Sequence, residues 1–291
     1  MDSMIPVPNR RPGKLWVFLQ YPLTRFLAAF AVLFIWIGAM VLVLKFGKVE
    51  PETPLAAMIL LIDAIGIPII YTGFVHFMEK RPVVELAAKG AQRFAARGVL
   101  VGAALFCIVM LVSKLLGAWT YVGTSPLSYA AYPFIGALFT GILEETIFRG
   151  LLFRLMEERL GSWIALAISA LLFAVAHGLN PGITLVAIAS IFMAGLLLGA
   201  AYMYTRSLWF VMGLHFAWNF TEGGIFATPV SGSRPQGIIA VHFTGPDLLT
   251  GGAFGAEGSL TAVVICLAAA IAFIMFARRS RRVVAPFWKK R

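Results

Sequence analysis

The chain has 291 residues, of which 60% are hydrophobic and 13% are charged. Soluble domains carry about 25% charged residues, so this composition excludes an ordinary soluble fold. The formal net charge is +11, but the basic residues cluster in short segments that flank apolar runs, which indicates membrane topology rather than a nucleic-acid partner.

Eight apolar runs are long enough to cross a bilayer as helices, which takes about 17–25 residues. Helices are expected rather than a barrel, because the runs lack the alternation of barrel strands. The predicted fold is therefore all-α, a polytopic transmembrane helical bundle that is integral to the membrane. The predicted spans are residues 26–44, 55–78, 98–117, 131–156, 162–178, 183–204, 207–225 and 260–277.

The spans are expected to form a single transmembrane domain over residues 26–277, with a catalytic core at about 130–225. A cytoplasmic N-terminal arm, 1–25, precedes this domain, and a basic cytoplasmic tail, 278–291, follows it. Lysine and arginine concentrate in the segments that an N-in arrangement places in the cytoplasm, so both termini are expected on that side.

Two segments outside the spans have a distinct composition. Residues 79–97 alternate charged and apolar side chains, which predicts an amphipathic helix at the membrane interface. Residues 226–259 are rich in glycine, serine, threonine and proline. A connector is the favoured interpretation of this second segment, and a lid or a substrate-contacting loop are the alternatives.

Polar and ionisable side chains interrupt several predicted spans. A charged side chain at the bilayer centre costs at least about 2.5–3.5 kcal/mol, so such residues are expected to face the bundle interior and are functional candidates. Asp63 stands alone in the second span, where packing or a water cavity would explain it. The later spans contribute Glu144, Glu145, Arg149, His177, His215 and Asn219.

Helix geometry predicts how these side chains are directed. Glu145 and Arg149 are four residues apart and are expected to pair on one helix face, which leaves Glu144 directed elsewhere. His215 and Asn219 are also four residues apart and are expected to face one cavity. The helical rise places all of the candidate groups near the middle of the membrane, where they could meet.

These residue types suit the hydrolysis of an amide bond. A carboxylate accepts a proton from water, a histidine orients that water, and two donors hold the developing oxyanion. Glu144 and His177 suit the first two roles, and His215 with Asn219 suits the third.

Three other chemistries could use residues of these kinds. A serine or cysteine nucleophile is less favoured, because no GxSxG motif is present and Cys107 and Cys266 are expected to lie apart from the polar residues. A proton-coupled transporter would also use intramembrane carboxylates and histidines, although no inverted repeat is visible. A zinc hydrolase with Glu144, His177 and His215 as ligands stays open, without an HExxH motif.

Three short motifs resemble those of a known family. EETIFR (144–149), FAVAH (173–177) and HFAWN (215–219) are similar to the EExxxR, FxxxH and HxxxN motifs of the CAAX protease and bacteriocin-processing (CPBP, Abi) family of intramembrane glutamic proteases. That family includes the Ras-converting CAAX endopeptidase and bacterial self-immunity proteins. The resemblance covers about residues 130–225.

The resemblance implies a role for each matched residue. Glu144 would be the general base, His177 its partner in activating water, and His215 with Asn219 the oxyanion site, with no metal or other cofactor required. Glu145 and Arg149 would support them.

The resemblance also implies partners and a location. The partners would be the bilayer and a membrane-associated peptide or protein, which need not be prenylated. The EKRP and TGGAFG segments look like the bacterial branch, which implies the bacterial cytoplasmic membrane. A non-proteolytic immunity or scaffold protein is the alternative, and no oligomeric state is indicated.

Overall fold

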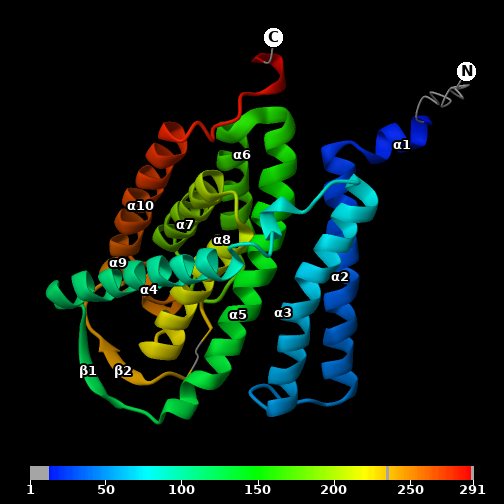
Figure 1. Ribbon diagram of the computed structural model, residues 1–291. Helices are drawn as coiled ribbons and strands as arrows, with labels where there is room; N and C mark the ends of the chain where they lie inside the picture. The colour runs from blue at the N-terminus through cyan, green and yellow to red at the C-terminus, as the bar shows by residue number, and fades with distance from the viewer. Residues whose placement is uncertain (1–12, 234–235, 290–291) are drawn as a thin grey trace, which may run out of the picture.

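The computed structural model describes residues 13–233 and 236–289. These residues form a bundle of helices with one two-stranded sheet (Figure 1). Both ends of the described chain lie at the same end of the bundle, as the N-in, C-in prediction requires (Figure 1). Residues 1–12 of the predicted arm and 290–291 of the predicted tail lie outside the described residues.

The elements follow the predicted order. The helices are α1 (Lys14–Leu19), α2 (Pro22–Phe46), α3 (Pro54–Phe74), α4 (Ala91–Leu115), α5 (Ala131–Glu145), α6 (Arg154–Ala176), α7 (Leu185–Thr205), α8 (Leu208–Asn219), α9 (Asp247–Thr250) and α10 (Leu260–Arg279). Three π-helical segments continue them, η1 (Val75–Glu79), η4 (Thr146–Phe153) and η5 (Phe220–Ile225).

The predicted multi-pass helical bundle is confirmed. Within the described residues, six helices are long and apolar enough to cross a membrane. One of them, Leu127–Ala176, has 50 residues and accounts for two of the predicted spans. It changes direction at Gly161 (φ 76°), and the Ser169 hydroxyl donates to the carbonyl of Phe148 (3.1 Å), so its two halves lie side by side.

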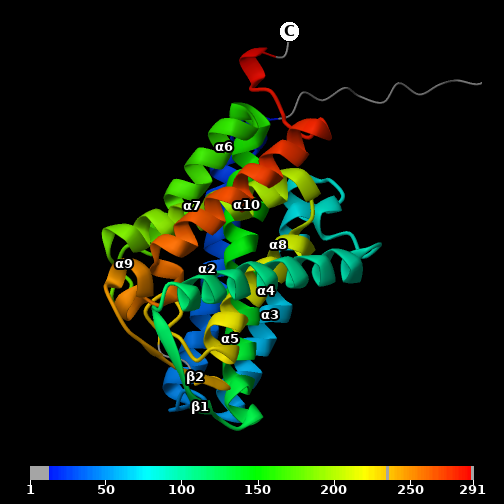
Figure 2. The ribbon, with the colours of Figure 1, turned by 90° about the vertical axis from the view of Figure 1, so that its left-hand side faces the viewer.

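Helix α4 lies across the other helices, as Figures 1 and 2 both show. Two glycines on its inner face, Gly98 and Gly102, make this contact possible. A Cβ atom at these positions would overlap the carbonyl oxygens of Phe210 and Leu214 in α8. The backbone of α8 is therefore held directly against α4.

The predicted amphipathic helix at 79–97 is wrong in its first half. Residues Val84–Leu86 form only a short 3₁₀ turn, and α4 begins at Ala91. Pro82 lacks the N–H that a helix interior needs, and Gly90 adopts a left-handed conformation (φ 85°) directly before α4.

The small sheet was not predicted. Strand β1 (Trp119–Thr124) pairs antiparallel with β2 (Ile239–Phe243), which is more than one hundred residues away in the sequence. Pairing at such a separation depends on tertiary structure, and a five-residue strand leaves a weak pattern in a chain this apolar. The sheet lies at the end of the bundle opposite the termini (Figure 1).

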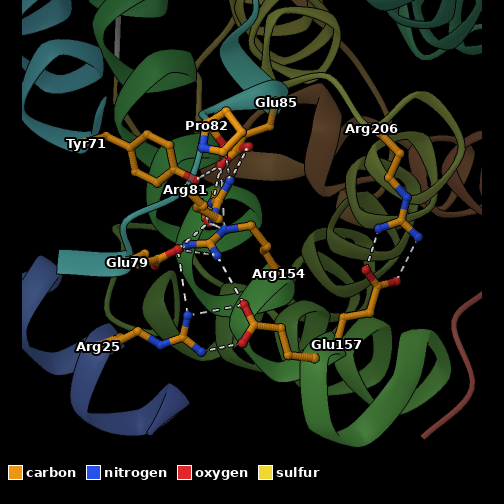
Figure 3. Close-up of polar contacts among 11 residues, drawn as sticks. Arg25, Tyr71, Glu79, Arg81, Pro82, Glu85, Arg154, Glu157 and Arg206 are labelled. Carbon is orange, nitrogen blue, oxygen red and sulfur yellow. Dashed lines mark hydrogen bonds and ion pairs between the residues drawn. The ribbon is translucent and has the colours of Figure 1, made fainter. Parts of the chain in front are cut away.

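Figure 3 shows a cluster of ion pairs around Glu79, Arg81 and Arg154. Glu79 accepts from Arg154 (2.7 Å) and Arg81 (2.8 Å), and Arg81 also donates to Glu85 (2.7 Å). Arg154 in addition donates through Nε to the carbonyl of Gly150 in η4 (2.8 Å). The cluster therefore connects the end of α3 to α6 and fixes the backbone of the π-helical segment.

This cluster changes the pKa of the Glu85 carboxylate, which lies outside the membrane spans. Its side chain is only 2% exposed, and burial alone would raise its pKa. Hydrogen bonds from Arg81 and Tyr71 outweigh burial and hold the pKa of Glu85 below its ordinary value. Because the pKa is lowered on folding, the ionised carboxylate stabilises the fold above the unfolded-state pKa.

We expect Glu85→Gln to lower the free energy of unfolding by about 1.5–3 kcal/mol near neutral pH, because Arg81 and Tyr71 lose a buried charged acceptor while Arg81 keeps Glu79. The stabilisation by Glu85 should disappear as the pH falls below about 4.3 and through the lowered folded-state pKa. Unfolding in mixed micelles across this pH range measures both effects. Glu50→Gln, at an exposed position, is the control, and equal losses in the two variants would contradict the assignment.

Candidate active site

The residues singled out by the sequence lie around one cavity inside the bundle. Glu144 comes from α5, His177 follows α6, and His215 and Asn219 come from α8. All four line the same cavity of about 460 Å³. The structure therefore brings together side chains from three predicted spans.

The carboxylate of Glu144 faces both imidazole rings. One of its oxygens, Oε2, lies 3.7 Å from His177 Nε2 and 3.9 Å from His215 Nε2. This oxygen is buried and makes no hydrogen bond with any described residue. Both ring nitrogens therefore lie just beyond hydrogen-bond distance of this oxygen. A small polar ligand placed between them could bond to the oxygen and to the rings.

The backbone orients the ring of His177. Its Nδ1 lies 2.8 Å from the carbonyl oxygen of Phe173, one helical turn earlier. A carbonyl can only accept, so Nδ1 carries a hydrogen, and Nε2 is the ring nitrogen that faces Glu144.

A second carboxylate orients His215. Its Nδ1 lies 2.8 Å from Glu145 Oε1, so the other ring nitrogen, Nε2, is directed toward Glu144 and the cavity. Glu145 also accepts from Arg149 Nη1 (2.7 Å), and both of these side chains have no exposed surface. The predicted pairing of Glu145 with Arg149 is therefore present, but its link to His215 was not predicted.

Arg149 is held on its other sides by a backbone carbonyl and an aromatic ring. Its Nη2 donates to the carbonyl of Gly195 in α7 (3.0 Å), and its guanidinium lies 4.7 Å from the centroid of the Phe173 ring. Gly195 also lets α7 lie directly against α6, since a Cβ there would lie 2.9 Å from Cα of Ala170. Arg149 thus joins the helices that carry Glu145 and His177.

Asn219 offers an unused amide to the cavity. The residue is 9% exposed, lies one turn beyond His215, and makes no hydrogen bond through its side chain with the described residues. A buried amide usually has a partner. An amide without one that lines a cavity is available to a ligand.

The segment 226–259 does more than connect two helices. Ser231, Ser233 and Glu257 from this segment line the cavity. The Oε1 atom of Glu257 accepts from the backbone N–H and from the hydroxyl of Ser231, both at 2.6 Å. The connector interpretation therefore missed a wall of the site, because the contact depends on how the segment folds back.

The other polar residues from the sequence analysis occupy different places. Asp63 is buried in α3 at 3% exposure and does not line the cavity. Cys107 is exposed on α4. Cys266 was expected to lie apart from the polar residues, and this expectation is wrong, because α10 packs on α7 and brings Cys266 into the cavity wall.

Metal ligation depends on how the donor side chains are arranged. Over residues 13–233 and 236–289, no group of three or more histidine, cysteine, aspartate and glutamate side chains is placed to hold a metal ion.

A double-mutant cycle tests the buried pair of Glu145 and Arg149. We expect Glu145→Gln and Arg149→Met each to lower the free energy of unfolding by about 3–5 kcal/mol, because each leaves an uncompensated charge in the bundle. The double variant should lose clearly less than the sum of the two, since no charge is then left alone. Additive losses would show that the two side chains do not interact.

Comparison with known families identifies the segment that carries this geometry. Residues 125–221 match the family model described as type II CAAX prenyl endopeptidase Rce1-like. No curated protein and no solved structure matches the chain. The matched segment includes η4, α6, α7 and α8 and all of the motif residues. The chain is therefore a multi-pass membrane protein whose residues 125–221 are similar to the Rce1-like type II CAAX prenyl endopeptidases.

Proposed function

We propose that the chain is an intramembrane endopeptidase that hydrolyses a peptide bond of a membrane-associated peptide or protein, with Glu144 as general base. The family match supports protease activity in general. The observation that carries the mechanism is the position of Glu144 Oε2, 3.7 Å from His177 Nε2 and 3.9 Å from His215 Nε2. The apolar wall, with Phe173, Leu198 and Trp218, suits apolar side chains of a substrate.

In this mechanism, Glu144 and His177 activate a water molecule. Two atoms 3.7 Å apart can both bond to one water, since hydrogen bonds of about 2.8 Å reach it from each side. The water donates one hydrogen to Glu144 and the other to Nε2 of His177. Its oxygen attacks the carbonyl carbon as Glu144 takes the proton, and Glu144 returns that proton to the leaving nitrogen when the C–N bond breaks.

His215 and Asn219 would stabilise the oxyanion of the tetrahedral intermediate. The Asn219 amide has no hydrogen-bond partner among the described residues and lies one helical turn from His215. The contact of His215 Nδ1 with Glu145 leaves Nε2 facing the cavity, and Nε2 donates to the oxyanion when it carries a hydrogen. Glu145 and Arg149 are positioning residues in this scheme.

The proposed steps use side chains alone and no metal ion. Each proton acceptor and donor in them is a residue of the cavity wall. Zinc held by Glu144, His177 and His215 is the competing mechanism. Zinc would supply Lewis-acid activation in place of the general base, but no group of three such side chains among the described residues is placed to hold a metal ion.

The first prediction of this mechanism concerns the general base. We expect Glu144→Gln and His177→Ala to lower cleavage of a model peptide by about 10²–10⁴-fold, because proton transfer from water is lost. The cleavage rate is measured with purified variants in nanodiscs. Only variants that unfold at the same temperature as the parent are compared. Asp63→Asn is the matched control, a buried intramembrane carboxylate outside the cavity, and it should cleave like the parent.

The same assay separates the alternatives. Undiminished cleavage by both Glu144→Gln and His177→Ala would remove the proposed mechanism. Proton-coupled flux in proteoliposomes that depends on Asp63 or Glu144, without peptide cleavage, would favour a transporter instead. An absence of both activities in the parent would favour an immunity or scaffold role.

The second prediction concerns the oxyanion site. Asn219→Ala should lower kcat by about 10²–10³-fold and leave KM nearly unchanged, because the amide donates mainly to the charge that develops in the transition state. Steady-state kinetics on the same peptide measure this split. A rise in KM with unchanged kcat would show that Asn219 binds the ground state instead.

A further inference from the structure

The cavity opens at the end of the bundle opposite the termini. Its exposed wall residues lie in three connections, Glu52 between α2 and α3, Pro181 between α6 and α7, and Ser233 after η5. Figure 1 shows the α2–α3 connection at the end away from both termini. A substrate therefore reaches the site from the side that the positive-inside pattern makes non-cytoplasmic.

The wall of this cavity is acidic. Three carboxylates line it, Glu52, Glu144 and Glu257, and no lysine or arginine does so among the described residues. In a site walled largely by apolar groups, such a charge favours a cationic group of the ligand.

Glu257 is the carboxylate among them that is fixed in place. Its Oε1 accepts twice from Ser231, at 2.6 Å each. Its backbone N–H donates to Glu222 (3.0 Å), and its backbone carbonyl accepts from the Ser190 hydroxyl (2.5 Å). Its second oxygen, Oε2, makes no hydrogen bond with the described residues, while the residue itself lines the cavity.

Asn219 indicates independently that a polar ligand occupies this cavity. Its amide is buried at 9% exposure, lacks a partner among the described residues and lines the same wall. In the proposed mechanism, Asn219 binds the carbonyl oxygen of the substrate. The mechanism gives no role to Glu257, which is outside the matched segment 125–221.

We propose that Glu257 is a specificity-determining residue, whose free carboxylate oxygen binds a cationic nitrogen of the peptide substrate close to the bond that is cleaved. The nitrogen is a lysine or arginine side chain, or the amino terminus of the peptide. The inference rests on the proposed function, since it names the substrate class of that same site.

The experiment uses synthetic apolar peptides that carry one Lys, Gln or Glu at a varied position, each with a free or an acetylated amino terminus. The parent should cleave the cationic peptides with a kcat/KM about tenfold or more above that of the neutral ones, as one charge-assisted hydrogen bond provides. Preference for Lys identifies a side chain as the ligand, and preference for a free terminus identifies the ammonium group.

Substitutions at Glu257 then test the assignment. Glu257→Gln keeps an oxygen acceptor for Ser231 and should abolish the preference, and Glu257→Lys should transfer it to the Glu peptides. Asp247→Asn, at an exposed position of the same segment that does not line the cavity, should keep it. An unchanged preference in Glu257→Gln, or its loss in Glu52→Gln alone, would overturn the inference.

A binding measurement separates this inference from the proposed function. Fluorescence anisotropy of labelled Lys and Gln peptides is measured with Glu144→Gln, and with Glu144→Gln combined with Glu257→Gln. Tighter binding of the Lys peptide only to the first variant supports Glu257, even where the parent cleaves nothing. Cleavage by the parent without any charge preference would leave the proposed function standing and remove the inference.

Discussion

The candidate site depends on one carboxylate that water does not reach. Glu145 has no exposed surface, and its Oε1 accepts from both Arg149 (2.7 Å) and His215 (2.8 Å). A charge buried in this way is stable only while its partners stay in place, so the contact fixes the helix that carries Glu145 relative to α8. Because neighbouring residues on a helix point about 100° apart, fixing Glu145 also directs Glu144 into the cavity, toward His177.

The rest of the fold maintains this arrangement. The π-helical segment η4 places Arg149 against the carbonyl of Gly195, and π-helical turns occur often at functional sites. At the end of the bundle that carries the termini, Arg154 and Glu79 hold the backbone of the same segment (Figure 3). Helix α4 packs on α8 through Gly98 and keeps the helix of His215 in position. Contacts in different parts of the bundle therefore hold Arg149 and His215 in position.

The sequence predicted the helices and the motif residues for a physical reason. Long apolar runs permit only helices in lipid, and a spacing of four residues was enough to pair Glu145 with Arg149. The crosswise course of α4 could not be predicted, since it follows from backbone contact at Gly98 rather than from hydropathy. The contact of His215 with Glu145 joins residues 70 positions apart, and Glu257 reaches the wall through a fold of its own segment. Such contacts leave no periodic signal.

The most direct test of the account is an experimental structure of the Glu144→Gln variant with an uncleaved peptide bound. We expect the scissile carbonyl inside the cavity, with its oxygen at hydrogen-bond distance from His215 and Asn219, and an ordered water between residue 144 and His177. A peptide bound outside the cavity, or a metal ion held by the two histidines, would contradict it.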